Sequence, residues 1–257
     1  MPSPPIGPPP TGTTSPAVVA PLDPVTVWRP TKKWNANRGG TSSTQYGAGP
    51  VECTSTGRLG FAKPVHVWQE WLASRLGSVV GVGVPQVLLG SVQGASHLSA
   101  VSVVWGTGID VRGLRVLYAD FDTNPSICQG LVAASGLLAF HTWIGTGDHK
   151  DEHLLGRELA GGRFEFVAID FGFAFRWGTP AEPVVGDGPK SLKDHFDTAV
   201  VSAVVNVIEA FRDEDIRDTV ALLPGDVLPI GERVRVADGL VTRKTGVRLA
   251  MQAKGWI

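Results

Sequence analysis

Cysteine is scarce in this chain, which has only Cys53 and Cys128 among its 257 residues. Two cysteines so far apart in the sequence are too few for the disulfide framework of a small secreted domain. We therefore expect a protein of a reducing compartment and predict a cytoplasmic location.

The chain also lacks an excess of basic residues. Its 23 lysines and arginines are balanced by 24 aspartates and glutamates, which leaves a formal net charge of −1. A global positive charge is what usually attracts nucleic acids without regard to sequence. The composition therefore predicts no nucleic-acid partner.

Long hydrophobic runs are absent as well. The longest apolar region, residues 131–144, is interrupted at Ser135 and Gly136, and it is shorter than the roughly 20 residues that cross a bilayer. It predicts a buried helix, and we expect no membrane insertion. Because no basic residue precedes Arg29, we expect no signal peptide either.

Proline is concentrated at one end of the chain. Residues 1–24 are rich in proline, glycine, serine and threonine, a composition that predicts a disordered tail.

Hydrophobic residues make up 43% of the whole chain, which is enough for one large core or two smaller lobes. No internal repeat is visible.

Two carboxylates frame the most informative segment. Asp148 and Asp170 lie 22 residues apart, with Gly161 and Gly162 between them. A glycine pair suits a two-residue hairpin turn because it adopts positive φ. In that register Ala160 would pair with Arg163, and His153 would pair with Asp170.

Directly opposed residues in an antiparallel pair have Cα atoms roughly 4.5–5.5 Å apart, so one cation could contact both His153 and Asp170. Phosphoryl transfer uses such an arrangement. One carboxylate orients the attacking hydroxyl, and a second carboxylate with a neighbouring ligand holds Mg²⁺ on the phosphates.

Residues 147–153, Gly-Asp-His-Lys-Asp-Glu-His, resemble the Asp-Arg-His-x-x-Asn catalytic loop of phosphatidylinositol kinases and HipA-like kinases. Residues 169–172, Ile-Asp-Phe-Gly, resemble the metal-binding Asp-Phe-Gly run of those families. The resemblance implies that Asp148 positions and deprotonates the acceptor hydroxyl, while His153 and Asp170 hold the metal.

The first half of the chain resembles the same HipA-like family in the same order. Residues 58–64 read as a strand ending in Lys63, which the resemblance assigns to the α/β-phosphates, and Glu70, on the next helix, falls at the position of the ion-pair partner of that lysine. The glycine- and serine-rich stretch at residues 38–45 resembles the phosphate loop of the family. Residues 102–106 resemble the strand and hinge beside the adenine. The implied nucleotide-binding residues are Gly39, Gly40, Thr41, Ser42, Ser43, Lys63, Val104 and Gly106.

The family resemblance implies an α+β, two-lobed protein-kinase-like fold, similar to that of phosphatidylinositol kinases. We expect a β-rich N-lobe over residues 25–106 and a mainly helical C-lobe over residues 107–257. The implied function is that of an ATP-dependent kinase that uses Mg²⁺ and phosphorylates a serine or threonine hydroxyl of a protein. A lipid or small-molecule acceptor stays open.

Some residues depart from the family pattern or have a simpler interpretation. His153 stands where the family has an asparagine, and an imidazole suits Mn²⁺ better than Mg²⁺. Helical periodicity places Glu70 opposite the apolar stripe that includes Trp71 and Leu72, so Glu70 taken alone reads as a solvated glutamate.

Two other functions are compatible with the same segment. A kinase fold could bind nucleotide without transferring phosphate and would then tolerate His153. The run from His149 to His153 is also a His-x-x-Glu-His motif, in which two histidines on one helix bind zinc and Glu152 activates water. Glu232 could supply the third ligand of such a metalloprotease.

Overall fold

The computed structural model describes residues 25–31, 48–105, 108–147, 150–177 and 188–257. Its first half contains a closed five-stranded barrel in the order β1-β2-β3-β5-β4. The strands are β1 (Thr26–Pro30), β2 (Gly49–Cys53), β3 (Leu59–Lys63), β4 (Val87–Val92) and β5 (Leu98–Val103). All neighbours are antiparallel except β1 and β4, which are parallel and close the barrel.

Trp28 fills the barrel together with Val51, Ala62 and Val101, all of them buried. Gly90 on β4 is required for this packing, because a Cβ atom there would lie 2.5 Å from Cδ1 of Trp28. Buried residues alternate with less buried ones along β2 and β3, as in strands with one face on a core.

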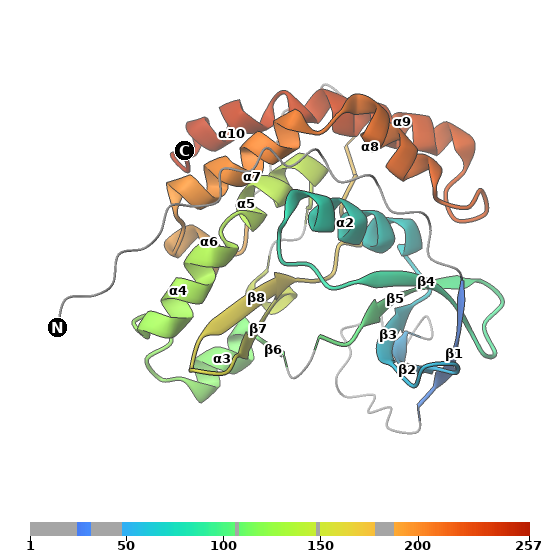
Figure 1. Ribbon diagram of the computed structural model, residues 1–257, viewed down its shortest axis with the longest axis horizontal. Coiled ribbons are helices and arrows are strands. Elements are labelled where there is room, and N and C mark those ends of the chain that lie inside the picture. The colour runs from blue at the N-terminus through green and yellow to red at the C-terminus, as the bar shows by residue number, and fades with distance from the viewer. Residues whose placement is uncertain (1–24, 32–47, 106–107, 148–149, 178–187) are drawn as a thin grey trace.

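Helix α2 (Val67–Val80) connects β3 to β4 and lies along the barrel, beneath α8 in Figure 1. It packs against β4 and β5 on one side and against α5, α7 and α8 on others. The hydroxyl of Ser74 fixes the middle of the helix to the start of β4: it donates to the carbonyl of Pro85 at 2.8 Å and accepts from the amide of Val87 at 3.0 Å.

A second, three-stranded sheet has the order β6-β7-β8. Its strands are β6 (Ile109–Asp110), β7 (Leu154–Glu158) and β8 (Phe164–Ala168), and a short 3₁₀ turn, η2 (Asp151–His153), precedes β7. The amide of Ala168 donates to the carbonyl of Gly83 at 2.8 Å, so the end of this sheet is attached to the loop between α2 and β4.

The hairpin register differs by one residue from the sequence prediction. Leu154 pairs with Ala168 and Glu158 with Phe164, so Leu159 and Arg163 close a loop over residues 160–162. Gly161 and Gly162 both have positive φ, 83° and 72°. The loop is therefore three residues long instead of two, and His153 lies opposite Ile169 instead of Asp170.

The apolar region expected to form one buried helix forms parts of two. Helix α3 (Val111–Leu117) is followed by α4 (Pro125–Ala134) and α5 (Leu137–Ile144), with a turn at residues 135–136 between the last two. By length and composition Pro125–Ile144 passes as a membrane-spanning segment, yet 72% of its most apolar window is buried inside the protein. This is the burial of a core helix.

The remaining described helices cover α2 and α5 (Figure 1). They are α6 (Lys190–Asp194), α7 (Thr198–Ala210), α8 (Asp213–Ala221), α9 (Ile230–Lys244) and α10 (Val247–Ala253). A turn at Thr245 and Gly246 separates α9 from α10.

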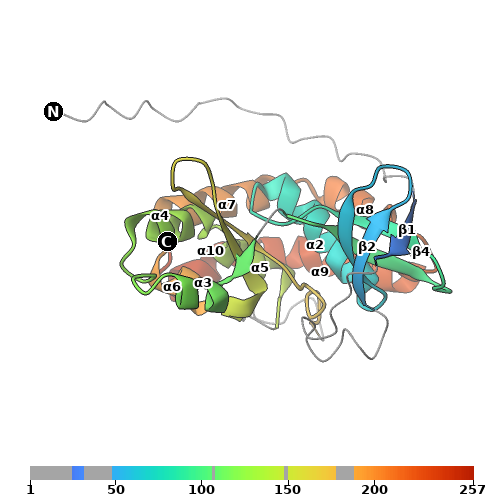
Figure 2. The ribbon, with the colours of Figure 1, turned by 90° about the horizontal axis from the view of Figure 1, so that it is seen from below.

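The main hydrophobic core is continuous across the expected boundary between the lobes. Trp71 and Leu89 from the first half belong to the same buried cluster as Trp143, Phe171 and Leu240 from the second half. The view from below in Figure 2 places β1 and β2 at one end of the molecule and α4 and α6 at the other. The structure is thus of the predicted α+β class, and the division into two lobes stays a prediction.

Candidate functional site

Lys63 connects two carboxylates that are far apart in the sequence. It ends β3, where it pairs with Ala100 of β5. Its Nζ lies 2.8 Å from Oε1 of Glu70 and 3.0 Å from Oδ1 of Asp170, which is 107 residues further along the chain. The barrel, helix α2 and the segment after β8 therefore each contribute one charged group to this cluster.

Glu70 is buried, with 2% of its side chain exposed, so the reading of this residue as a solvated glutamate is wrong. Helical periodicity gave the wrong exposure for Glu70 because it assumes that one face of α2 meets water. In the structure α2 contacts the barrel on one side and other helices elsewhere, so most of its surface is buried. A carboxylate in such a place requires a cationic partner. Lys63 is that partner.

The two carboxylates also control the charge of the lysine. Burial lowers the pKa of Lys63, but the carboxylates of Glu70 and Asp170 outweigh that effect and raise it above its ordinary value. Burial raises the pKa of Asp170, and the ammonium of Lys63 reverses this so that the pKa is lowered. The lysine is therefore a permanent cation and Asp170 a permanent anion near neutral pH.

Asp170 adopts the left-handed backbone conformation, with φ of 63°. Aspartate enters this region more readily than most residues. The next residue, Phe171, is buried and stacks on His141 at a centroid distance of 5.7 Å. The Asp170 side chain, in contrast, is 44% exposed, so the turn buries the phenyl ring and leaves the carboxylate accessible.

His153 lies beside Asp170 in spite of the shifted register. Its Nε2 is 3.7 Å from Oδ2 of Asp170, which is too far for a hydrogen bond and close enough for both atoms to contact one cation. An imidazole nitrogen and a carboxylate oxygen are acceptable ligands of Mn²⁺ and, less favourably, of Mg²⁺. The donor set of these residues fits a cation that completes its coordination with phosphate oxygens.

The local structure contradicts the zinc-protease interpretation. That motif requires one α-helix through both histidines, whereas residues 151–153 form a 3₁₀ turn and Leu154 begins a strand. Glu232 lies in the first turn of α9, where it binds Arg235. Within the described part of the chain, no three histidine, cysteine or acidic side chains are grouped closely enough to hold a metal.

Asp148 lies outside the described residues, but its neighbours on both sides are held in place. The amide of Gly147 donates to the carbonyl of Phe173 at 3.4 Å. On the other side, the carboxylate of Asp151 accepts from the amide and the hydroxyl of Ser191 at 3.0 and 2.8 Å. Gly147, which precedes Asp148 in the sequence, therefore lies next to the segment that follows Asp170.

The nucleotide-binding residues expected around Lys63 are only partly described. Val104 follows β5, is 48% exposed, and its amide donates to the carbonyl of Leu59 at 3.0 Å. The other expected residues of this set lie outside the described residues, namely Gly39, Gly40, Thr41, Ser42, Ser43 and Gly106.

One interaction near the expected hinge could not be found from the sequence. The guanidinium of Arg157, on β7, lies 4.2 Å from the ring centroid of Trp105 and binds Glu165 on β8. Trp105 directly follows Val104. The hairpin thus supports the segment that leaves the barrel, through a pair of residues that no local motif connects.

Searches with models of known protein families and against curated protein sequences found no match. Among solved structures, the chain is similar to the crystal structure of the Helicobacter pylori proinflammatory kinase CtkA. The TM-score is 0.58 at 11% sequence identity, and the match covers 79% of this chain and 93% of that one. This chain has a kinase-like fold.

The kinase-like fold confirms the coarser part of the sequence prediction. A lysine at the end of a barrel strand, a glutamate on the following helix and an aspartate after a later hairpin occur here in the order expected from the motifs. At 11% identity the likeness shows the fold alone. Membership of the HipA-like family and the roles of individual residues stay predictions.

Proposed function

We propose that this protein is an ATP-dependent phosphotransferase that uses Mg²⁺ or Mn²⁺. The observation that carries the proposal is the position of Lys63 between a buried carboxylate, Glu70, and an accessible one, Asp170. A structural ion pair would need only one carboxylate. A lysine that also contacts an exposed aspartate beside a histidine is a cationic group placed where anionic phosphates and their metal could bind.

Each group in this cluster has a role under the proposal. Glu70 holds the ammonium of Lys63 in place, and Lys63 neutralises the α- and β-phosphates of ATP. Asp170 and His153 would hold the metal ion, which when bound would offset the negative charge of the phosphates. The Gly39–Ser43 stretch and the Val104–Gly106 segment are proposed to bind the phosphates and the adenine, respectively.

The transfer step is assigned to Asp148. Its carboxylate takes the proton of the acceptor hydroxyl while the hydroxyl oxygen forms a bond to the γ-phosphorus. The bond between the γ-phosphorus and the β,γ-bridging oxygen breaks, and ADP leaves with that electron pair. We propose a serine or threonine of a protein as the acceptor, on the basis of the resemblance to HipA-like kinases.

The test is Asp148→Asn, which keeps the size of the side chain and removes the base. The purified variant should bind ATP with a metal as the native protein does, and its phosphate transfer to itself or to a serine/threonine peptide library should fall at least about a hundredfold. Radiolabelled ATP measures the transfer. Asp238→Asn, at an exposed residue that pairs with Arg217, is the matched control and should transfer normally.

Retained transfer in Asp148→Asn would remove Asp148 from the reaction. If the native protein binds ATP with a metal but transfers no phosphate to any acceptor, the function is instead nucleotide binding without catalysis. The observation that favours this second candidate is the imidazole of His153 beside the carboxylate of Asp170, at the position where HipA-like kinases have a metal-binding asparagine.

His153→Asn tests the choice of metal. An amide oxygen is a better ligand for Mg²⁺ than an imidazole nitrogen, so we expect the native protein to work better with Mn²⁺ and the variant to shift towards Mg²⁺. The ratio of transfer rates in the two metals should change by roughly tenfold, the equivalent of one altered hydrogen bond or ligand contact. His195→Asn provides a control outside the cluster, and an unchanged ratio in His153→Asn would exclude His153 as a ligand.

A further inference from the structure

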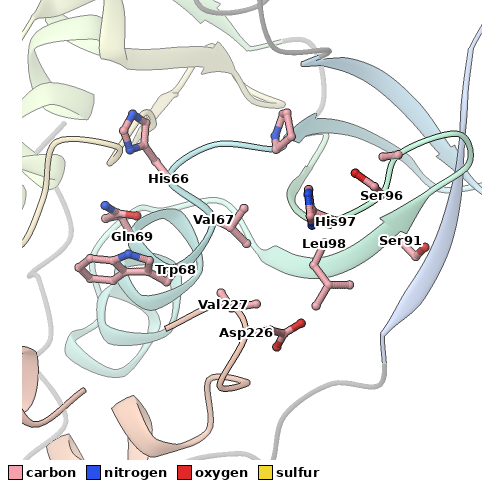
Figure 3. A pocket seen from close by; sticks show the side chains of 12 residues that line it. His66, Val67, Trp68, Gln69, Ser91, Ser96, His97, Leu98, Asp226 and Val227 are labelled. Atoms are coloured by element: carbon pink, nitrogen blue, oxygen red, sulfur yellow. The ribbon is translucent and has the colours of Figure 1, made fainter. Parts of the chain in front are cut away.

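A pocket of about 510 Å³ opens beside the charged cluster and does not include it. Figure 3 shows Trp68 and Gln69 of α2 on one side of this pocket, with His97, Leu98 and Asp226 on the other. The volume is within the range of sites that bind small molecules, about 300–1,000 Å³. Lys63, Glu70, His153 and Asp170 do not line it.

Two acceptor groups at this pocket have no donor among the described residues. Gln69 is 7% exposed, and its Oε1 is buried without a hydrogen-bond partner. No hydrogen bond or ion pair joins the carboxylate of Asp226 to another described residue. A buried amide oxygen without a donor is unfavourable by about 1–3 kcal/mol. The carboxylate of Asp226, an exposed residue, is open to a ligand that brings N–H groups.

The charge of the lining points to a cation. Asp226 is the acidic residue of the lining, and within the described chain no lysine or arginine lines the pocket. Of its two histidines, His66 has its pKa lowered by burial, which favours the neutral imidazole. Trp68 and Leu98 add apolar surface, and an indole ring can also attract an ammonium group through its face. A protonated amine attached to an apolar or aromatic body would meet each of these groups.

Residues that line the pocket are sequence neighbours of residues in the charged cluster. Pro64, which lines it, directly follows Lys63, and Gln69 directly precedes Glu70. The ring of Trp68 lies 5.5 Å from that of Phe175, in the segment that continues from Asp170. A ligand that moves the first turn of α2 would therefore also move Glu70.

We propose that this pocket binds a small organic cation, a protonated amine with an apolar or aromatic body, and that its binding changes the affinity for ATP. Binding of the amine is independent of the proposed function. The effect on ATP rests on that function, because it acts through Glu70 on Lys63.

Three compounds with one indole body separate charge from shape. Tryptamine is a cation, 3-ethylindole is neutral and indole-3-acetate is an anion near pH 7. Titrated into the full chain by calorimetry, tryptamine should bind most tightly, 3-ethylindole more weakly and indole-3-acetate weakest. Absence of binding by all three at millimolar concentration, or an affinity for the anion equal to that for tryptamine, would overturn the proposal.

Asp226→Asn locates the bound amine. It should weaken tryptamine at least about tenfold, the usual effect of losing a charged hydrogen-bond partner, and leave 3-ethylindole unchanged. Asp218→Asn on α8, which does not line the pocket, is the matched control and should bind tryptamine as the native protein does. An unchanged tryptamine affinity in Asp226→Asn would place the amine elsewhere and contradict the assignment.

The effect on ATP is measured separately. The affinity for ATP with a metal should change by roughly fivefold or more when tryptamine saturates the pocket, a usual size for coupled sites. By reciprocity, ATP should change the tryptamine affinity by the same factor. An unchanged ATP affinity overturns the coupling. A protein that binds tryptamine through Asp226 but binds no ATP would contradict the proposed function and still confirm the pocket.

Discussion

Lys63→Met should abolish metal-assisted ATP binding and phosphate transfer, with a loss of at least about a hundredfold in transfer. Methionine matches the four-atom apolar stem of lysine and removes the ammonium that contacts both Glu70 and Asp170. It also leaves the carboxylate of Glu70 buried without its cation. Breaking a buried pair in this way typically destabilises a protein by about 3–5 kcal/mol, so the melting temperature should fall too.

A double variant separates function from folding. Lys63→Met with Glu70→Gln removes both charges, and the buried amide needs no cation, so much of the lost thermal stability should return while ATP binding stays absent. Lys190→Met is the control, because this lysine forms an exposed pair with Asp194, and such pairs contribute little. ATP binding by the folded double variant would exclude Lys63 as a phosphate ligand.

Asp170→Asn should remove the metal dependence of ATP binding and lower transfer at least about a hundredfold. Asparagine tolerates the left-handed backbone found at this position, so the substitution removes the negative charge and preserves the turn. Lys63 keeps Glu70 as its partner. Calorimetric titration of ATP, with and without Mn²⁺ or Mg²⁺, gives the metal dependence directly.

Asp170→Ala provides the comparison for the backbone. Alanine lacks the charge and also disfavours positive φ by about 1 kcal/mol, so it should lose the metal as Asp170→Asn does and melt at a lower temperature. If Asp170→Asn still binds ATP more tightly with metal than without it, the metal site is not at Asp170.

The ordered elements were predictable because their signals are local. The strand that ends at Lys63, helix α2 and the hairpin around Gly161 and Gly162 all lie where the sequence places them. The register of the hairpin was predicted wrongly by one residue. A glycine pair fits a two-residue turn and also a three-residue loop, so composition alone could not fix the register.

The features that the sequence predicted wrongly or did not reveal depend on packing between distant parts of the chain. Glu70 appears solvated if one face of α2 is assumed to meet water, and only the neighbouring helices reveal that it is buried. The parallel pairing of β1 with β4 closes the barrel between segments more than 50 residues apart in sequence, and neither strand carries a pattern that identifies its partner. The contact between Trp105 and Arg157 likewise joins residues about 50 positions apart that share no local motif.

The two hydrogen bonds of Ser74 have a mechanical consequence for helix α2. These bonds fix the middle of the helix to the start of β4. The first turn of the helix can therefore move chiefly by a tilt of the helix about Ser74. Glu70 lies four residues away, about 6 Å along the axis at 1.5 Å per residue. A tilt of about 10° would displace Glu70 by roughly 1 Å, enough to turn its contact with Lys63 into a separation too long for a hydrogen bond.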